Sequence, residues 1–431
     1  MDTERTVVPA IRDALVAACP VVRAASPEAD AIAGVVPSFV AFPASTQEAS
    51  DLLRAAAAFD LAVVPRGAGT GLGWGPPPSA CDLVIDLQAM DQVIEHAAGD
   101  LVARVQAGAT TGHLAAVLAA AGQELALDVP ADATVGGVVA TGTTGPRRFR
   151  YGAPRDLLIG ITIVRADGVV AHSGGKVVKN VAGYDLGKLF SGSQGTLGLI
   201  TEATFRLHPR PAAVAWVTGD YGPTAFAAVS AAVASAAGSA LVPSAVELAW
   251  SAGVLRIGVL LEGTESGVAE RAGRMAELVA SAGGTPVVAR SEVPSRWFDL
   301  VPAAGAPAVV VRVSFWLSRL AGVLEALAAA GASAGVAPVV SGPAGAGVLY
   351  ASLEPGVPEE DAARFVLELR DALAVPAGSG PRGSVAVLAA PPAVMTAAGA
   401  FGPLPGAALM RAVKDQFDPG HRMFPGRLGG S

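Results

Sequence analysis

Hydrophobic and polar positions follow two different periods in the first part of the chain. Ser45-Thr46-Gln47-Glu48 has the pattern of a capping box that opens a helix. Short apolar runs at Leu61–Val64 and Leu83–Leu87 predict buried strands. The pattern therefore predicts a strand–helix–strand unit. The predicted helix carries its apolar side chains on one face: Ala49, Leu52, Leu53 and Ala56.

The next segments also alternate between strand and helix patterns. Leu101–Val105 predicts a strand, and Thr111–Ala121 predicts a helix opened by Thr110 or Thr111. Apolar runs at Leu157–Arg165 and Val169–His172 flank the turn sequence Ala166-Asp167-Gly168. We expect these two runs to pair as a hairpin.

The composition changes near Pro209-Arg210-Pro211. After this point Ala-rich helical segments alternate with short strands such as Leu255–Leu261 and Val309–Phe315. Proline punctuation together with a change in composition is typical of a linker, so we place a domain boundary here. At 431 residues, two or three domains are expected.

A glycine-rich loop follows the strand predicted at Leu61–Val64. It reads Pro65-Arg66-Gly67-Ala68-Gly69-Thr70-Gly71-Leu72-Gly73. Glycines let backbone N–H groups converge on a phosphate. The Rossmann spacing fails, because the third glycine would fall at Leu72 or Trp74, and Gly75-Pro76-Pro77-Pro78 stands where that fold needs a helix. The loop alone is more often only a tight turn.

Composition and charge narrow the class of protein. Hydrophobic residues make up 52% and charged residues 16%, as in a folded globular protein. The net charge of −7 argues against nucleic acid as a partner. Cys19 and Cys81 do not have the spacing of a metal or iron–sulfur site, and a single disulfide between them is an alternative that the sequence leaves open.

The N-terminus lacks a signal-peptide pattern. The uncharged stretches Tyr221–Val246 and Gly383–Met410 are interrupted by Gly, Pro and Ser. We therefore expect a soluble, cytoplasmic protein with no transmembrane segment.

Residues 128–207 hold the densest set of motifs. Thr134-Val135-Gly136-Gly137 would by itself be a turn or a β-bulge. It is followed by Thr141-Gly142-Thr143-Thr144-Gly145, by Lys176 through Asp185, and by Gly192 through Glu202. Taken singly, the charged members have ordinary roles: Arg147 and Arg148 as a solvated pair, Lys176 and Lys179 as loop charges, and Tyr184 and Asp185 in local packing and capping.

In combination, this ordered set resembles the flavin-binding domain of the vanillyl-alcohol oxidase superfamily, also called the PCMH-type FAD-binding domain. Within it, the run looks most like the smaller FAD-binding subunits of bacterial glycolate oxidases. The resemblance covers roughly residues 35–210 and the C-terminal tail. It implies an α+β fold with these parts: an N-terminal helical segment (1–34), an FAD-binding domain of two α+β subdomains (35–210), an α+β cap or docking domain (211–405) and a C-terminal segment that packs on the FAD-binding domain (406–431).

The resemblance also implies which residues contact the cofactor. The first glycine loop would hold the pyrophosphate, the second and third motifs would line the ribityl chain and ring, and the segment around Ile200 would close over the flavin. The assigned residues are Pro65, Arg66, Gly67, Ala68, Gly69, Thr70, Gly71, Pro130, Thr134, Val135, Gly136, Gly137, Thr141, Gly142, Thr143, Thr144, Gly145, Arg148, Tyr151, Gly195, Thr196, Gly198 and Ile200.

Two departures from the superfamily change what is expected. Several relatives attach FAD through a His or Cys, often a His in the first loop, where this chain has Ala68 and Thr70. Non-covalent FAD is therefore expected. Metal-dependent relatives use clustered histidines in the substrate domain, whereas no histidine lies between residues 209 and 420 here, so we expect no metal site. Glu247 and Glu262 are expected to be structural carboxylates.

Three functions stay open. The chain is the FAD-binding subunit of a glycolate-oxidase-type complex, a self-sufficient flavin oxidoreductase for an alcohol or hydroxy acid, or a flavin-bearing accessory subunit without turnover. The first implies a larger flavoprotein and an iron–sulfur subunit as partners, and peripheral membrane association through them. Four arginines could bind a substrate carboxylate, and the sequence nominates no general base. They are Arg147, Arg148, Arg312 and Arg427.

Overall fold

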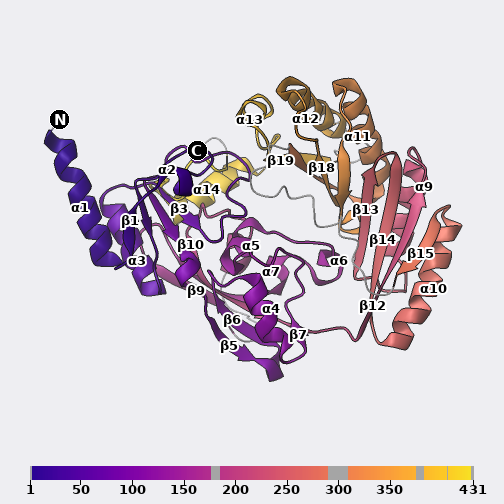
Figure 1. Cartoon of the computed structure of the whole chain (residues 1–431), viewed down its shortest axis with the longest axis horizontal. Coiled ribbons are helices and arrows are strands. Elements are labelled where there is room, and N and C mark those ends of the chain that lie inside the picture. Colours follow the sequence, from indigo (N-terminus) through magenta and orange to yellow (C-terminus); the bar gives the residue numbers. More distant parts are fainter. Residues whose placement is uncertain (1, 176–184, 290–308, 375–382, 405, 429–431) are drawn as a thin grey trace. The chain divides into compact units, whose positions relative to one another are not determined.

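The computed structural model describes residues 2–175, 185–289, 309–374, 383–404 and 406–428. Lys176, Lys179 and Tyr184, which the sequence analysis considered, lie outside these ranges. The chain divides into two compact units (Figure 1). Unit 1 comprises Met1–Thr144, Ala153–Arg210 and Pro405–Ser431, and unit 2 comprises Gly145–Gly152 and Pro211–Leu404. Residues 145–152 thus group with unit 2, although they lie inside the range expected for the FAD-binding domain.

The first sheet of unit 1 carries the glycine-rich loop. Its strand order is β1-β2-β4-β3, with β2 and β3 both parallel to the central β4. The predicted helix start is confirmed, because the Ser45 hydroxyl accepts a hydrogen bond from the Glu48 N–H at the start of α3. The reciprocal half of the capping box is shifted by one residue, since the Glu48 carboxylate accepts from the Ala44 N–H. The elements are α1 (Asp2–Ala18), β1 (Val22–Ala24), α2 (Pro27–Asp30), β2 (Phe39–Ala41), α3 (Thr46–Ala58), β3 (Val63–Arg66) and β4 (Leu83–Asp86).

The second sheet of unit 1 is antiparallel, with strand order β5-β6-β10-β8-β9. The predicted hairpin is confirmed as β8 and β9, and Gly168 adopts a φ of +79° in the turn. The strands are β5 (Val93–Ala97), β6 (Val102–Gln106), β8 (Leu158–Val164), β9 (Val170–Gly174) and β10 (Leu199–Arg206). A short pair joins β7 (Gln123–Glu124) to β11 (His208–Pro209).

Short helices connect these strands. Thr110 caps the predicted helix α4 through the N–H of His113, and Thr134 caps α5 through the N–H of Gly137. The Thr134–Gly137 segment is therefore the start of a helix, where its isolated pattern suggested a turn or bulge. The helices are α4 (Thr111–Ala119), α5 (Val135–Thr141), α7 (Pro154–Leu157) and α8 (Leu186–Phe190).

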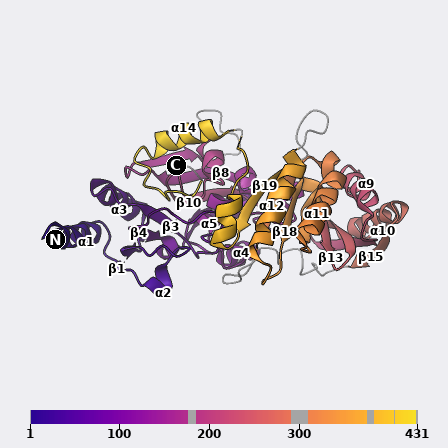
Figure 2. The same cartoon turned by 90° about the horizontal axis from the view of Figure 1, so that it is seen from above.

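The C-terminal segment returns to unit 1 and extends its first sheet. The N–H of Val63 donates to the Arg422 carbonyl, and the N–H of Phe424 donates to the Val63 carbonyl, each at 2.8 Å. The preceding helix α14 (Ala407–Phe417) lies over β8 and β10 in Figure 2. Its Phe417 ring packs edge-on against Phe190, with centroids 5.5 Å apart.

A buried lysine fixes α14 to the rest of unit 1. Lys414 is 5% exposed, and its Nζ donates to Asp418 Oδ2 at 2.6 Å and to the carbonyls of Thr196 and Met423 at 2.7 Å. Burial lowers the pKa of Lys414, although Asp418 opposes the shift. The three acceptors satisfy the three protons of the ammonium group. A charged lysine can therefore be buried at this position.

Unit 2 contains one large antiparallel sheet, with strand order β15-β12-β14-β13-β17-β18-β16-β19 among the described residues. Alternate side chains of these strands join helices α9 to α12 in one apolar core. The strands are β12 (Ala213–Tyr221), β13 (Ala245–Ser251), β14 (Val254–Gly263), β15 (Thr285–Ala289), β16 (Val310–Phe315), β17 (Val339–Gly342), β18 (Val348–Ser352) and β19 (Gly383–Ala389). The helices are α6 (Arg148–Tyr151), α9 (Phe226–Ala237), α10 (Glu265–Ser281), α11 (Leu320–Ala334), α12 (Glu359–Ala374) and α13 (Pro392–Ala398).

One helical stretch among the described residues, Leu317–Ala334, is long and apolar enough by composition to cross a membrane. The sequence analysis did not single it out. In the structure, Leu320, Leu324 and Leu327 on α11 are fully buried in the core of unit 2. This stretch therefore serves as a core helix of that unit.

Replacing Lys414 by Met should lower the free energy of unfolding by about 3–5 kcal/mol, since Asp418 would then be a buried charge without its partner. Chemical denaturation of the full chain measures this change. Lys188→Met is the matched control, because Lys188 and Asp185 form an exposed ion pair, which contributes about 1 kcal/mol or less. Equal unfolding midpoints for the two variants would contradict this role for Lys414.

Candidate functional site

The loop after β3 presents a row of unused backbone donors. The N–H groups of Gly67, Ala68, Gly69, Thr70 and Gly71 donate to no partner among the residues that the structure describes. These residues are exposed or half-buried, so a ligand can reach them. No helix follows the loop before β4, as the failed Rossmann pattern predicted. Such consecutive N–H groups form a site for an anion.

Two glycines let this loop lie directly against α5. A Cβ on Gly67 would stand 2.0 Å from Thr134 Oγ1, and a Cβ on Gly71 would stand 2.9 Å from Thr141 Cγ2. Both distances are shorter than van der Waals contact. The first and second motifs, about 70 residues apart in sequence, are therefore neighbours because glycine occupies these two positions.

The N-terminus of α5 is already satisfied. The N–H of Val135 donates to the Ala109 carbonyl at 2.8 Å, and the N–H of Gly136 donates to the Ala107 carbonyl at 2.7 Å. A Cβ on Gly136 would lie 2.7 Å from the Ala107 Cβ. Gly136 thus serves close packing of α5, and its N–H is not offered to a ligand.

The third motif lies against the other two. The N–H groups of Gly192 and Gln194 donate to the carbonyls of Val139 and Ala140 at the end of α5. A Cβ on Gly195, where φ is +75°, would lie 3.2 Å from the Pro65 side chain. The sequence predicted the three motifs separately, and the structure brings them together within unit 1.

The other residues of these motifs have local partners. The Pro130 carbonyl accepts from the Thr111 hydroxyl at 2.6 Å, and the Thr141 and Thr143 hydroxyls are 2.6 Å apart. The Thr196 hydroxyl donates to the Ser193 carbonyl. Thr144 Oγ1 is buried without a hydrogen-bond partner among the described residues. The remaining positions stand as follows: Gly142 has a φ of +68° after α5, Gly198 has a φ of +153° before β10, and Ile200 pairs with Ile163 in the ladder of β10 and β8.

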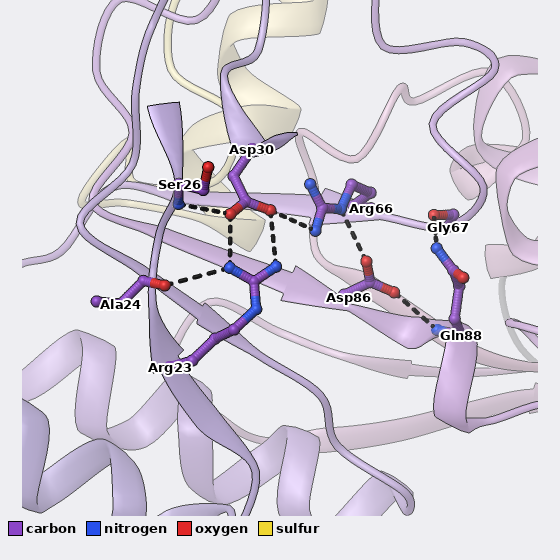
Figure 3. A network of polar contacts seen from close by, with 8 residues as sticks. All are labelled: Arg23, Ala24, Ser26, Asp30, Arg66, Gly67, Asp86 and Gln88. Carbon is purple, nitrogen blue, oxygen red and sulfur yellow. Dashed lines mark hydrogen bonds and ion pairs between the residues drawn. The ribbon is translucent and has the colours of Figure 1, made fainter. Parts of the chain in front are cut away.

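Arg66 is held by two buried carboxylates (Figure 3). Its Nη2 donates to Asp30 Oδ1 at 3.0 Å, and its Nε donates to Asp86 Oδ2 at 2.8 Å. Asp30 and Asp86 are each 1% exposed. Arg66 was expected to hold a pyrophosphate, but these contacts direct two of its donor atoms to the interior and neutralise its charge.

The same network extends to both sides of Arg66. Arg23 donates to both Asp30 oxygens, at 2.6 and 3.0 Å, and the Ser26 N–H donates to Asp30 Oδ2 at 2.8 Å. Arg23 thereby holds the pKa of Asp30 well below its usual range, despite the opposing effect of burial. Gln88 donates from its side chain to the Gly67 carbonyl at 3.2 Å, so the network ends at the first glycine of the loop (Figure 3).

Three of the predicted residues, Gly145, Arg148 and Tyr151, belong to unit 2. The Tyr151 hydroxyl donates to Glu262 Oε2 at 3.0 Å, and Arg147 Nη1 lies 3.3 Å from Glu262 Oε1. Burial, followed by the nearby Glu262 charge, raises the pKa of Tyr151 to about 12. Glu262 is thus a structural carboxylate, as the sequence suggested, and Tyr151 stays protonated at neutral pH.

The structural roles of Asp30 and Lys414 were not predicted from the sequence, and Arg427 was predicted only as a candidate to bind a substrate carboxylate. Asp30 lies in an unremarkable N-terminal segment, so its sequence gave no signal. Lys414 and Arg427 lie in the C-terminal segment, and Arg427 follows the turn-like sequence Phe424-Pro425-Gly426. This sequence does not by itself indicate which residues contact either side chain.

The site is suited to an anionic, phosphate-bearing ligand. Its donors are backbone N–H groups in a row, and its floor is formed by α5, which comes close only because Gly67 and Gly71 lack a Cβ. Ala68 and Thr70 bear neither an imidazole nor a thiol. The glycine loop itself therefore offers no group of the kind that forms a covalent bond to a flavin.

The glycine loop and α5 both lie in a segment that matches a known family. Residues 37–174 match the family described as FAD binding domain. The chain is 38% identical over 182 residues to glycolate oxidase subunit GlcD of Bacillus subtilis, which covers 41% of this chain and 38% of that protein. It is 37% identical over 181 residues to D-2-hydroxyglutarate dehydrogenase of Xanthomonas citri, covering 41% and 38%. The matches thus span about two fifths of each relative's length.

Solved structures show the fold. p-Cresol methylhydroxylase with substrate bound aligns with a TM-score of 0.74 at 17% identity, covering 98% of this chain and 96% of that chain. 4-Ethylphenol oxidase from Gulosibacter chungangensis aligns with a TM-score of 0.73 at 15% identity, covering 99% and 97%. The predicted α+β fold is therefore confirmed, and residues 37–174 within it are the ones that match the FAD binding domain family.

Gly67→Ala should destabilise the protein by about 1–3 kcal/mol, because the new methyl group would overlap Thr134 Oγ1. Gly73→Ala in the same loop is the control, since a Cβ there meets nothing within 4 Å. We expect it to change the free energy of unfolding by about 0.5 kcal/mol or less. Urea denaturation compares the two, and equal stabilities would refute the close approach of the loop to α5.

Asp30→Asn should reduce stability at neutral pH and should make it less dependent on pH in acid. The lowered pKa of Asp30 means that its contribution is complete above the unfolded-state pKa of about 4 and is lost as the pH falls further. The difference between wild type and variant should therefore shrink below about pH 4. Urea denaturation between pH 7 and 3 measures it, with Asp51→Asn, at an exposed ion pair, as control. A constant difference across this range would count against the Asp30 network.

Proposed function

We propose that this chain, whose residues 37–174 match the FAD binding domain family, is an FAD-dependent oxidoreductase that acts on a 2-hydroxy acid. The observation that carries this proposal is the row of free N–H groups at Gly67–Gly71, packed against α5 inside the matched region. These donors fit the pyrophosphate of FAD, which carries two negative charges. Bound FAD would supply the acceptor for a hydride or electrons, and the protein would position the donor.

The residues that would hold FAD come from the three converging motifs. Gly67–Gly71 would bind the pyrophosphate through backbone N–H groups. The Thr141 side chain lies beside this loop at Gly71, and its hydroxyl bonds to the Gly137 carbonyl and to Thr143. Thr144 Oγ1 has no partner among the described residues and would be a further hydroxyl for the cofactor. Gly195 and Thr196 would close the site from the third motif. With Ala68 and Thr70 in the first loop, we propose that FAD is bound non-covalently.

The substrate class is supported by the names of the relatives. They include a glycolate oxidase subunit, a probable D-lactate dehydrogenase from Danio rerio and D-2-hydroxyglutarate dehydrogenases. Each of these compounds is a 2-hydroxy acid with a carboxylate. Since the chain matches only part of each relative, we extend the proposal to the class and not to one substrate.

We further propose that the chain works as the FAD-binding subunit of a complex in the cytoplasm and passes electrons to a partner. The name of one relative, glycolate oxidase subunit GlcD, supports the subunit role. Cys19 and Cys81 are both buried free thiols, and neither lies in an iron–sulfur motif. Electrons on the flavin would then leave to a separate iron–sulfur protein, a larger flavoprotein, a quinone or oxygen.

Reconstitution with FAD tests the cofactor. The purified full chain should bind FAD and become yellow, and acid precipitation should release the flavin into the supernatant. Flavin retained in the precipitate would show a covalent bond and would refute the non-covalent attachment. Absence of flavin absorbance after reconstitution and desalting would refute the proposed function as a whole.

Anaerobic addition of glycolate, D-lactate and D-2-hydroxyglutarate, each separately, tests the activity. Loss of flavin absorbance near 450 nm without a partner, on the order of seconds to minutes for a working enzyme, would identify a self-sufficient dehydrogenase. Reduction only after a partner subunit is added would support the complex. Bound flavin that no 2-hydroxy acid reduces under either condition would contradict the oxidoreductase assignment.

A further inference from the structure

Arg427 lies beneath the glycine loop and binds its carbonyl groups. Its Nη2 donates to the Gly71 carbonyl at 2.9 Å, and its Nη1 donates to the Leu72 and Pro76 carbonyls at 3.2 and 3.1 Å. Its Nε donates to Gln194 Oε1 in the third motif at 2.8 Å. The guanidinium therefore links the end of the first loop to the third motif.

These bonds fix the end of the loop. A peptide group points its C=O and N–H in nearly opposite directions. The peptide group whose carbonyl is Gly71 therefore points its Leu72 N–H away from Arg427, and this N–H donates to the Gly69 carbonyl at 3.1 Å. Arg427 thus holds the turn at Gly69–Leu72, which adjoins the N–H groups of Gly67–Gly71 that have no partner among the described residues. Gln88 holds the Gly67 carbonyl at the other end of the loop.

The charge of Arg427 is not neutralised by a carboxylate. The side chain is 2% exposed, and no Asp or Glu of the described ranges lies within 4.0 Å of its nitrogens. Its guanidinium lies 4.7 Å from the centre of the Phe424 ring, a favourable cation–π contact. Burial lowers the pKa of Arg427 to about 10, which leaves it charged at neutral pH. A buried cation without a counter-ion is costly unless an anion binds nearby.

Arg66 presents the opposite case. Its charge is balanced by Asp30 and Asp86, so it adds little net attraction for a phosphate. Of these two arginines, only Arg427, in the C-terminal segment, has no carboxylate partner among the described residues. The glycine loop and Arg427 are about 350 residues apart in sequence.

We propose that Arg427 is the positioning residue and the counter-charge for the pyrophosphate of FAD, and that it acts through the Gly71 and Leu72 carbonyls. This rests on the proposed function, since it assigns a role toward the same cofactor. It follows that cofactor retention depends on the docked C-terminal segment. Arg427 is therefore not the residue that receives a substrate carboxylate, a role that the sequence alone had left open to it.

The test compares Arg427→Gln with Arg427→Lys and with a matched control. Arg370 in unit 2 is also a guanidinium whose pKa burial lowers, and it donates to the carbonyls of Ala398, Gly399, Ala400 and Val385. Arg370→Gln removes the same kind of contact far from the glycine loop in sequence and in a different unit. All variants are made in the full chain, and melting temperatures are measured without FAD.

Affinities for FAD, ADP and riboflavin provide the readouts. ADP carries the pyrophosphate without the isoalloxazine ring, and riboflavin carries the ring without phosphate. We expect Arg427→Gln to weaken the binding of FAD and ADP by about 10- to 100-fold, which is the effect of losing hydrogen bonds that involve a charged group. The affinity for riboflavin should stay unchanged. The salt dependence of ADP binding should become shallower. The ADP affinity of Arg427→Lys should lie between those of wild type and Arg427→Gln, since lysine keeps the charge but lacks the planar guanidinium that donates to several carbonyls at once.

Each outcome decides the proposal. If Arg427→Gln binds FAD and ADP within about twofold of wild type, the positioning role is refuted. If Arg370→Gln weakens FAD as much at equal loss of melting temperature, or if ADP and riboflavin weaken together, Arg427 is merely structural. Should Arg427→Gln fail to fold, Arg427→Lys decides by the same ratio of ADP to riboflavin affinity. Wild type that binds no FAD would instead refute the proposed function, which keeps the two failures distinct.

Discussion

The close approach of the Gly67–Gly71 loop to α5 is the constraint on which the rest of unit 1 depends. Because Gly67 and Gly71 lack a Cβ, the loop can touch Thr134 and Thr141 directly. The N–H groups of Gly67–Gly71 have no partner among the described residues. Consecutive backbone N–H groups that an anion can reach are the kind of site that binds a phosphate.

Charges on two sides keep this loop in place. At its start, Arg66 is fixed between Asp30 and Asp86, and at its end, Arg427 binds the Gly71 carbonyl. The two arginines differ in a way that matters for an anion, because only Arg66 is neutralised by carboxylates among the described residues. Lys414 secures the same tail that carries Arg427. The N-terminal segment therefore supports the loop through the ion pair of Asp30 with Arg66. The C-terminal segment supports it through the hydrogen bonds of Arg427 and also brings the charge of this residue to the loop.

Local patterns predicted the elements of unit 1 well. Ser45 and Thr110 cap the helices where their sequences indicate, and the turn at Gly168 forms the expected hairpin, since capping and turn chemistry act over a few residues. The strand at Leu61–Val64 is shifted to β3, Val63–Arg66, because pairing with β4 decides its ends. The Thr134–Gly137 segment forms a helix start, since its N–H groups find the Ala107 and Ala109 carbonyls, which no local pattern reveals.

The sequence by itself determined that the chain has three glycine motifs in a fixed order, that the first is not a Rossmann loop, and that Ala68 and Thr70 offer no attachment point for a flavin. These follow from residue identity and spacing alone. Only the tertiary structure decided which donors remain free, that Gly136 serves packing, that Arg66 faces two carboxylates, and that Arg427 supports the loop. The reason is physical. A residue can bind a ligand only with the donors and the charge that are not already bonded to its neighbours in space, and here those neighbours come from both ends of the chain.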